Sequence, residues 1–362
     1  MKNYFKSSVG NILLPLFFPD ATQSVVKTLD SLDIEATSTP GVLVNTYHLY
    51  RELGNTIFEK FDGIREFMGW KGAVISDSGG FQIMSIIKSK SGKGKVSDVG
   101  IAIHTSKNKK ILLTPEKSIG YQLLLRTDLV VVLDDFTPMS ATYEEAKESV
   151  ERTISWAIRC KKYFDEHTTK DYKPYIIGVV QGGKYLDLRK YCCEELVKIG
   201  FDGLGYGGWP INESGKFDYE IAELIATNSP KSCLLYGLGI GKPDEIVKLV
   251  KMGYRIFDCV LPTRDARHKR LYVYTAKSID EINLDSDKFY RYYVPDKQMY
   301  FADKNPISSA CDCLLCKHYS RSYLAHLFRI GDMSALRLST IHNLRFYSIL
   351  MEKLQYNYLH GK

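Results

Sequence analysis

Short apolar runs alternate with longer amphipathic segments along most of this chain. The apolar runs cover residues 41–49, 72–80, 128–136, 175–183, 201–208, 233–241 and 254–264. The amphipathic segments carry apolar residues at spacings of three and four, as helices do, and cover residues 116–127, 142–164, 185–200, 219–227 and 243–253. Short buried strands that alternate with helices predict a parallel sheet made of β/α units.

Two architectures contain such a sheet, and the residues at the strand ends distinguish them. A doubly wound sheet usually carries a glycine-rich phosphate loop after its first strand, and no G-x-G-x-x-G or Walker-type loop occurs in that position of the sequence. A (β/α)8 barrel instead gathers functional residues at the carboxyl ends of many strands. Polar residues or glycines end the predicted strands, namely Asn45, Asp77, Asp134, Gln181, Gly208, Gly239 and Asp258. We therefore predict an α/β protein with a (β/α)8 TIM barrel.

The two ends of the chain differ from this repeating pattern. The apolar run at residues 11–18 contains Pro15, and no small-residue cleavage site follows it, so we predict early strands rather than a signal peptide. No apolar run approaches the roughly 18 residues of a membrane-spanning helix. Residues 277–310 are polar and rich in tyrosine, and a cysteine cluster with two helical segments follows at 311–354. We predict a barrel domain at residues 1–290 and a small subdomain at residues 291–362.

Composition and charge change this picture little. The chain has 362 residues, of which 44% are hydrophobic and 25% charged, so it can bury a large core like an ordinary globular protein. The formal net charge of +7 is compatible with a polyanionic partner, although an excess of this size does not identify one. The lysine-rich segment 88–98 is predicted to be a solvent-exposed loop.

A cysteine cluster near the end of the chain predicts a metal site. Its members follow a Cys-x-Cys-x-x-Cys pattern and are Cys311, Cys313 and Cys316. This spacing favours metal ligation over disulfides, and hence a reducing compartment such as the cytoplasm. A structural zinc ion takes four ligands at the corners of a tetrahedron, so a fourth must come from elsewhere. His318 follows Cys316 too closely, and we expect His326 on the solvent side of a helix. We therefore predict one structural zinc ion whose fourth ligand is His342, at the start of the last helix.

Three aspartates at strand ends suit chemistry at a sugar. Two carboxylates that flank a glycosidic carbon carry out retaining glycosyl transfer, one as the nucleophile and the other as the general acid/base. If Asp77, Asp134 and Asp258 share one barrel mouth, one carboxylate remains for another task. A guanine ring presents two neighbouring donors, N1–H and N2–H₂, which a single carboxylate can accept together.

Other strand-end residues complete a pocket for a base of this kind. The Gln181 amide and the Gly208 N–H can donate to the oxygen at C6 of guanine, while Asp134 accepts from N1 and N2. Phe81 and Leu238 can cover the two faces of the flat ring. The residue types at the strand ends therefore match a guanine-like base, provided that they converge.

Six motifs together resemble one known family. They are "SDSGGFQ", "VVQGG", "FDG…GG", "GIGKPDEI", "FDCVLPTR" and C-x-C-x₂-C-x₂₅-H, which occur in the order and with the spacing of the queuine tRNA-ribosyltransferases, from about residue 10 to about residue 355. The resemblance implies an irregular (β/α)8 barrel with a small C-terminal zinc-binding subdomain. It also implies an enzyme that exchanges guanine at the wobble position of a tRNA anticodon for a 7-deazaguanine, preQ1 or queuine.

The resemblance also implies roles for individual residues. Asp258 would be the nucleophile that forms a covalent ribosyl-enzyme, and Asp77 the general acid/base. The residues around the base would be Ser78, Gly79, Gly80, Phe81, Asp134, Gln181, Gly208 and Leu238. The residues that contact RNA would be Gly239, Ile240, Gly241, Lys242, Pro243, Asp244, Glu245, Thr263, Arg264, Asp265, Ala266 and Arg267. The zinc ligands would be Cys311, Cys313, Cys316 and His342. The partners would be the anticodon stem-loop of tRNA and a second copy of the chain.

The sequence departs from the family pattern at two bulky positions. Phe136 stands where the bacterial pattern has a cysteine, and Trp209 stands where it has a small aliphatic residue. Glu213 falls where a bacterial glutamate lies near an aminomethyl group, which favours a base with a cationic substituent such as preQ1.

Three alternative functions follow from these features. The first is insertion of a 7-deazaguanine into DNA, for which the substitutions at Phe136 and Trp209 leave room. The second is a non-catalytic partner subunit, which the presence of both Asp77 and Asp258 argues against. The third is a zinc-stabilised glycosidase that acts on free sugars, which the guanine-shaped set of residues argues against.

Overall fold

The computed structural model describes residues 3–81, 83–84, 94–106 and 109–360. An eight-stranded sheet lies at its centre, and its neighbouring strands pair in parallel in the order β3-β13-β12-β11-β10-β9-β5-β4. In chain order these strands are β3 (Leu16–Pro19), β4 (Gly41–Asn45), β5 (Ala73–Asp77), β9 (Leu129–Val131), β10 (Tyr175–Val180), β11 (Gly203–Tyr206), β12 (Leu234–Gly237) and β13 (Tyr254–Cys259).

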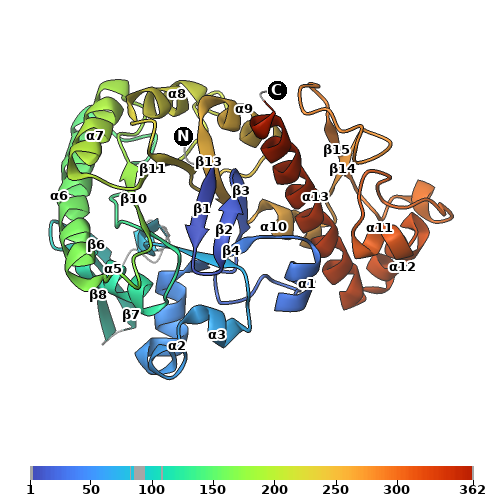
Figure 1. Ribbon diagram of the computed structural model, residues 1–362, viewed down its shortest axis with the longest axis horizontal. Coiled ribbons are helices and arrows are strands. Elements are labelled where there is room, and N and C mark those ends of the chain that lie inside the picture. The colour runs from blue at the N-terminus through green and yellow to red at the C-terminus, as the bar shows by residue number, and fades with distance from the viewer. Residues whose placement is uncertain (1–2, 82, 85–93, 107–108, 361–362) are drawn as a thin grey trace.

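The sheet closes on itself between its two outermost strands. Asp20, which follows β3, forms a parallel bridge with Leu43 of β4, and the Ala21 N–H donates to the Leu43 carbonyl at 2.7 Å. Helices surround the ring of strands (Figure 1). The predicted (β/α)8 barrel is therefore confirmed, with β3 as a strand that the alternating pattern after residue 40 does not include.

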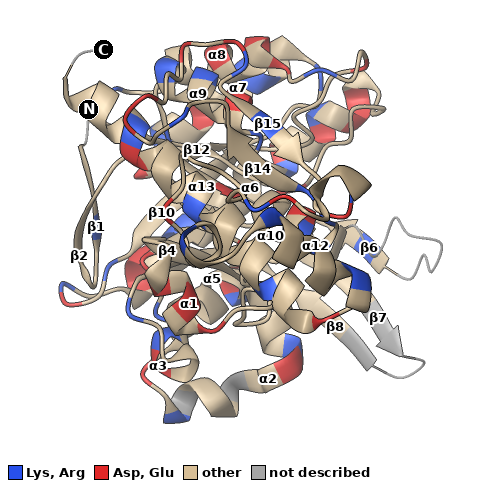
Figure 2. Ribbon diagram, turned by 90° about the vertical axis from the view of Figure 1, so that its right-hand side faces the viewer, with Lys and Arg blue, Asp and Glu red and all other residues tan. Residues whose placement is uncertain are grey.

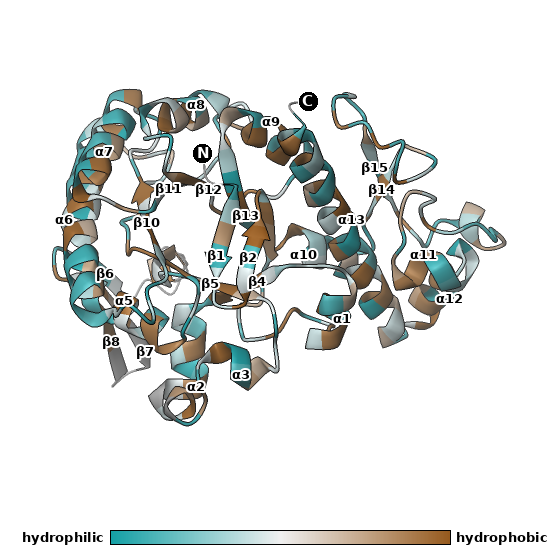
Figure 3. Cartoon of the chain, in the orientation of Figure 1, coloured by the Kyte–Doolittle hydropathy of each residue, from teal (hydrophilic) through white to brown (hydrophobic). Residues whose placement is uncertain are grey.

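The helices of the barrel follow the predicted amphipathic segments closely. They are α5 (Pro115–Leu124), α6 (Tyr143–His167), α7 (Leu186–Ile199), α8 (Tyr219–Asn228) and α9 (Pro243–Met252). Helix α6 begins with a capping box, in which the Thr142 hydroxyl accepts from the Glu145 N–H and the Glu145 carboxylate accepts from the Thr142 N–H. The barrel strands are mostly hydrophobic, whereas α6 and α7 each carry both hydrophobic and hydrophilic residues (Figure 3). Each helix therefore covers the barrel with its apolar side.

Several elements depart from the sequence prediction. The segment 88–98 was expected to be a loop, but residues 94–97 form β6 (Gly94–Ser97), and residues 88–93 lie outside the described part of the chain. Strand β6 joins β7 (Gly100–Ser106) and β8 (Lys109–Leu113) in an antiparallel sheet. The run 254–264 is not one strand, because β13 ends at Cys259 and α10 (Leu261–Arg267) follows.

The amino end of the chain covers the amino ends of barrel strands. Strands β1 (Tyr4–Ser7) and β2 (Gly10–Leu13) form a hairpin, which confirms early strands in this region. Asp128, just before β9, accepts from the Ser8 N–H and hydroxyl, both at 2.7 Å, and from the Val74 N–H at 2.8 Å. Arg65 of α3 (Ile64–Met68) donates to the same carboxylate at 2.7 Å. One buried carboxylate thus joins the hairpin to β5 and β9.

The last third of the chain packs against one side of the barrel. It contains the hairpin β14 (Leu271–Tyr274) with β15 (Tyr290–Tyr293) and the helices α11 (Leu314–His318), α12 (Arg321–Ile330) and α13 (Met333–Leu359). Helix α13 packs against α10, α11, β14 and β3 (Figure 1). The region therefore has three helices where the sequence pattern predicts two. The division between residues 290 and 291 stays a prediction.

Candidate active site and metal centre

The carboxyl ends of the barrel strands bring the predicted site residues to one rim. Asp77 is the last residue of β5, Asp134 follows β9 and Asp258 lies near the end of β13. In a closed parallel barrel all these ends face the same side. Burial raises the pKa of both Asp77 and Asp258, and the charge of Asp20, which directly follows β3, adds to the rise in each, as expected for carboxyls that are near one another.

Asp77 is held by donors from the next strand and from its own turn. Its carboxylate accepts from Asn45 Nδ2 at 2.6 Å, from the Gly79 N–H at 3.0 Å and from the Thr46 N–H at 3.3 Å. Burial nevertheless raises the pKa of Asp77 to about 7, because desolvation of the charged form outweighs these hydrogen bonds. A carboxyl with a pKa near neutrality can both give and take a proton at physiological pH.

Asp258 is held through one of its two oxygens. Oδ1 accepts from the hydroxyl of Tyr236 at 2.7 Å and from the Gly239 N–H at 2.9 Å. No described residue donates to Oδ2 of Asp258. Burial raises the pKa of Asp258 to about 6, so the group is mostly ionised at neutral pH. This arrangement orients a carboxylate and leaves one oxygen for a nucleophilic attack.

Three candidate base-binding residues lie together at the ends of β9, β10 and β11. Gln181 is completely buried, and its Nε2 donates to Asp134 Oδ2 at 2.6 Å while its Oε1 accepts from the Thr137 N–H at 3.3 Å. A Cβ at Gly208, where φ is +83°, would lie 3.4 Å from Gln181 Oε1. Burial and the neighbouring charge of Asp135 raise the pKa of Asp134 to about 6. The set can present both acceptors and donors to one edge of a base.

The aromatic and turn residues near Asp77 have distinct surroundings. The ring of Phe81 is 49% exposed and lies edge-on to Phe136, with the centroids 5.2 Å apart. The Ser78 hydroxyl accepts from the Gly80 N–H at 3.2 Å, which fixes the turn. A Cβ at Gly79, where φ is +76°, would lie 2.8 Å from the Cβ of Tyr47, so no larger residue fits there. Phe81 therefore offers an open ring face at the rim.

The candidate RNA-contacting residues of α10 divide into exposed and buried members. Arg264 is exposed and Arg267 is partly buried, and the charge of Asp20 at the rim acts on Arg267. In contrast, Thr263, Asp265 and Ala266 are buried, and Asp265 accepts from the Tyr272 hydroxyl at 2.7 Å. Of the predicted contact residues in this helix, the two arginines therefore keep exposed surface, and their contact with RNA stays a prediction.

The candidate contacts at the start of α9 also divide. Gly239 is exposed, whereas Ile240, Gly241 and Pro243 are buried. Lys242 is partly exposed through its side chain and forms an ion pair with Glu245 at 3.0 Å. Asp244 accepts from the Tyr290 hydroxyl at 2.8 Å, which ties α9 to the β14–β15 hairpin.

Two residues near the rim that hold parts of the site are not predicted from the sequence. Tyr236 holds Asp258, but nothing distinguishes its hydroxyl within an apolar strand. Arg189 lies completely buried in α7 and donates to three backbone carbonyls, those of Val180, Gly183 and Gly207. An arginine on the apolar side of an amphipathic segment, next to Leu188 and Cys192, is a signal that could have identified Arg189.

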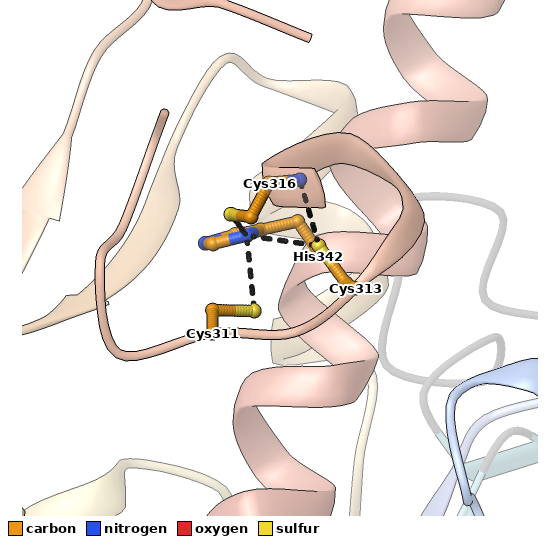
Figure 4. Close-up of side chains that lie close together, drawn as sticks. All are labelled: Cys311, Cys313, Cys316 and His342. Carbon is orange, nitrogen blue, oxygen red and sulfur yellow. Dashed lines mark hydrogen bonds between the residues drawn. The ribbon is translucent and has the colours of Figure 1, made fainter. Parts of the chain in front are cut away.

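The cysteine cluster and His342 form a compact set of metal donors. The four donor atoms lie within 4.8 Å of one another. His342 Nδ1 is 3.7 Å from Cys311 Sγ, 3.5 Å from Cys313 Sγ and 3.3 Å from Cys316 Sγ (Figure 4). Around a tetrahedral zinc ion, a cysteine sulfur and a histidine nitrogen lie roughly 3.5 Å apart. The four residues therefore fit a metal ion of this kind.

Neighbouring residues hold these donors in place. His342 Nε2 lies 2.8 Å from the Tyr272 carbonyl, which leaves Nδ1 to face the sulfurs. Asp312, between two of the cysteines, accepts from Arg345 Nε at 2.6 Å and so fastens the loop to α13. His342 is not at the start of the last helix, as the sequence suggested, but lies inside α13. His342, and not His318 or His326, is the histidine that lies among the three cysteines, and its role as a metal ligand stays a prediction.

The family comparison agrees with this arrangement of barrel, rim and metal donors. The model of the queuine tRNA-ribosyltransferase family matches residues 4–361. The chain belongs to the queuine tRNA-ribosyltransferase family.

Individual relatives in this family match nearly the whole chain. The queuine tRNA-ribosyltransferase of Psychrobacter cryohalolentis is 36% identical over 347 residues, 96% of this chain and 86% of that protein. That of Thermoanaerobacter sp. is 38% identical over 347 residues, 96% of this chain and 86% of that protein. That of Pasteurella multocida is 36% identical over 342 residues, 94% of this chain and 83% of that protein. These comparisons give no support to the DNA alternative.

Within the described ranges, none of the helices is long and apolar enough to cross a bilayer.

Proposed function

We propose that the protein is a tRNA-guanine transglycosylase that exchanges guanine at the anticodon wobble position for a 7-deazaguanine. The observation that supports this most is the pair of rim carboxyls with different surroundings. Asp258 has a pKa of about 6 and one oxygen without a donor among the described residues, whereas Asp77 has a pKa of about 7. At neutral pH one serves as a nucleophile and the other as a proton donor.

The first half of the reaction releases guanine. Asp258 Oδ2 attacks C1′ of the ribose, the C1′–N9 bond breaks, and a covalent ribosyl ester forms on Asp258. The electron pair of the broken bond goes to guanine, which Asp77 protonates as it leaves. Tyr236 and the Gly239 N–H keep Oδ1 of Asp258 occupied, so the attack comes from Oδ2.

The second half reverses these steps with a new base. Asp77, now ionised, removes the proton from N9 of the 7-deazaguanine, and N9 attacks C1′. The ester bond to Asp258 breaks, and the carboxylate is restored. Two displacements at one carbon retain its configuration, so the product has the same anomeric form as the substrate.

The base edge is read by the residues at the ends of β9, β10 and β11. Asp134 accepts from N1–H and N2–H₂ of the base, while the Gly208 N–H and a hydrogen of Gln181 Nε2 donate to the oxygen at C6. Glu213, proposed to lie near an aminomethyl substituent of the base, forms an ion pair with Lys184 at 2.9 Å.

Two arginines of α10 supply contacts for tRNA. Arg264 and Arg267 lie beside the rim, and basic residues of α10 are visible among mixed charges on this side of the molecule (Figure 2). Guanidinium groups bind phosphates through paired hydrogen bonds. We propose that they hold the nucleotides around the wobble position over Asp258.

One zinc ion bound by Cys311, Cys313, Cys316 and His342 would stabilise the C-terminal region. With four protein ligands a zinc ion keeps no open position, so its contribution is structural. Reduced thiolates and a tRNA substrate are both consistent with the cytoplasm.

The surface beside the metal loop supports a homodimer. Large apolar side chains are exposed on α12 and around it, namely Leu314, Tyr319, Tyr323, Ile330 and Met333. Tyr319 and Tyr323 stack with their ring centroids 5.1 Å apart. Exposed large apolar side chains are found at protein–protein interfaces, and we propose that these residues contact a second copy of the chain. Analytical ultracentrifugation would give the mass of a dimer, and a monomer at micromolar concentration would contradict this part of the proposal.

Exchange of labelled guanine into tRNA tests the proposed reaction. The wild-type protein is expected to incorporate guanine into tRNA that has an unmodified wobble guanine, and Asp258→Ala is expected to abolish incorporation. Duplex DNA is the parallel substrate, and competition by preQ1 and queuine ranks the bases. Incorporation into DNA alone, or undiminished exchange by Asp258→Ala, would contradict the proposal.

A further inference from the structure

Arg189 of α7 is a completely buried cation beneath the rim of the barrel. Among the described residues, its guanidinium donates to three backbone carbonyls, at 2.9 Å to Gly183, 2.6 Å to Val180 and 2.7 Å to Gly207. Its Nη2 has no hydrogen-bond partner among the described residues. A buried charge without a carboxylate partner is expensive, and burial lowers the pKa of Arg189. A neutral side chain at this position would avoid the free-energy cost of burying a charge. The presence of a charged arginine here therefore needs a physical explanation.

The three carbonyls belong to the two strand ends that carry candidate base-binding groups. Val180 is the last residue of β10 and Gly183 lies in the loop after it, and the two stand on either side of Gln181. Gly207 directly precedes Gly208 in the loop after β11. A Cβ at Gly208 would lie 3.1 Å from Nη2 of Arg189, so the guanidinium lies directly against Gly208. One side chain thus fixes the spacing between Gln181 and Gly208.

The bond to Gly207 has an electronic consequence as well. The carbonyl of Gly207 and the N–H of Gly208 belong to the same peptide group. A cationic donor on a peptide carbonyl draws electron density toward the oxygen, which makes the N–H of that peptide a stronger donor. In a buried setting this effect is screened less than in water.

We infer that Arg189 is a positioning residue that holds and polarises the Gly207–Gly208 peptide, so that the Gly208 N–H recognises the carbonyl oxygen at C6 of the base. This inference rests on the proposed function of the pocket. It predicts that Arg189 acts on the base through that oxygen, and not on the binding of tRNA.

Arg255 offers a matched control for a purely structural role. It is also a buried arginine, and its Nη1 donates to the carbonyls of Val250 and Tyr254, both at 2.8 Å. It lies near the start of β13, at the opposite end of the strand from the rim. Replacement of Arg255 by lysine therefore disturbs a comparable set of contacts away from the pocket.

The test compares two bases that share the N1–H and 2-amino donors and differ in the acceptor at C6. Guanine carries an oxygen there, and 6-thioguanine carries a sulfur, which is a weaker hydrogen-bond acceptor. Equilibrium dialysis of each labelled base would be measured with wild-type protein, Arg189→Lys and Arg255→Lys, and Arg189→Met would test loss of the charge. We expect Arg189→Lys to weaken guanine binding on the order of tenfold and 6-thioguanine binding far less. We expect Arg255→Lys to change neither affinity, and the KM for tRNA to stay constant in both lysine variants.

The outcomes separate the inference from the proposed function. An equal loss for both bases, or the same loss in Arg255→Lys, would overturn the role of Arg189. Wild-type protein that binds 6-thioguanine as tightly as guanine would overturn it too. Wild-type protein that binds guanine through that oxygen but exchanges none into tRNA would contradict the proposed reaction alone. Melting temperatures of the variants show whether each is folded.

Discussion

Asp77 and Asp258 are carboxyl groups at the same rim, but their hydrogen-bond donors differ in kind. Asp77 is held by an amide side chain and two backbone N–H groups, whereas Asp258 is held by a phenol and one N–H. Burial raises both pKa values, to about 7 and about 6. The proposed mechanism needs Asp258 ionised and Asp77 protonated in its first half, so kcat/KM should be highest between about pH 6 and pH 7.

Tyr236→Phe tests the acidic limb of this profile. The hydroxyl stabilises the ionised form of Asp258, so its removal should raise the pKa of Asp258 by about one unit and move the acidic limb to higher pH. At pH 8 activity should change little. Steady-state kinetics from pH 5 to pH 9 measure the shift. Tyr254→Phe removes a buried hydroxyl that donates to the Ala222 carbonyl instead, and it should leave the limb unmoved.

Asp258→Asn tests how much the ionised carboxylate of Asp258 destabilises the folded protein. Since burial raises the pKa of Asp258 to about 6, above the roughly 3.9 of an unfolded chain, its ionisation destabilises the folded state as pH rises from 4 to 6. The inactive variant should therefore melt roughly 1–3 °C higher than wild type at pH 7.5. At pH 4 the difference should vanish. A variant that melts lower than wild type at pH 7.5 would show that the ionised group stabilises the fold.

At the scale of single residues, the sequence predicts which groups meet but not what holds them. Asp134 and Gln181 stand at strand ends, where chain order and barrel geometry are enough to place them together. Tyr236 and Arg189 lie within a strand and a helix, and their roles depend on which loops pack above them. Those contacts arise from tertiary structure, which hydrophobic periodicity does not describe.

At the scale of elements, α10 and α13 connect the rim to the metal donors. Asn343 of α13 is completely buried, and its Nδ2 donates to the carbonyls of Pro262 at 2.9 Å and Arg270 at 3.0 Å. Its Oδ1 accepts from the Tyr272 N–H at 3.1 Å. Helix α10 is thereby fixed at both ends, so Arg264 and Arg267 project from a rigid support.

Arg264→Ala and Arg267→Ala test this element as a tRNA contact. Each substitution should raise the KM for tRNA about three- to tenfold. It should also lower the slope of log affinity against log salt concentration by about one, which corresponds to the loss of one phosphate contact. Affinity for the free base should not change. Arg329→Ala, on α12, provides an exposed control that should leave the KM for tRNA unaltered. Equal effects in all three variants would show a general response to lost charge.

The elements themselves differ in how well the sequence predicts them. Helices α6 to α9 each expose one face, so their apolar spacing of three and four is visible in the chain. Helix α13 is buried on nearly every side from Leu338 to Met351, so it lacks the polar face that would mark its beginning. This is why His342 was expected at its start. Strand β6 was missed because lysine and glycine dominate its surroundings in the sequence.

At the scale of the whole molecule, the metal donors join α11 and the loop before it to α13. Since α13 packs against α10 and β3, loss of the metal should loosen a large part of the C-terminal region. A strong chelator should remove one zinc ion per chain and lower the melting temperature by several degrees, and added zinc should restore it. Metal analysis with calorimetry measures both effects. A chain purified without zinc that melts normally would contradict the assignment.

The closure of the barrel has a consequence for the synthesis of the protein. Strand β13, which carries Asp258, pairs on one side with β12 and on the other with β3 from the beginning of the chain. A nascent chain therefore keeps an open sheet edge until β13 has left the ribosome. The group proposed to attack ribose is added in the same step that completes the ring. A nascent chain that has not yet reached β13 thus lacks both the closed ring and the proposed nucleophile, and it cannot modify the tRNAs that surround it during translation.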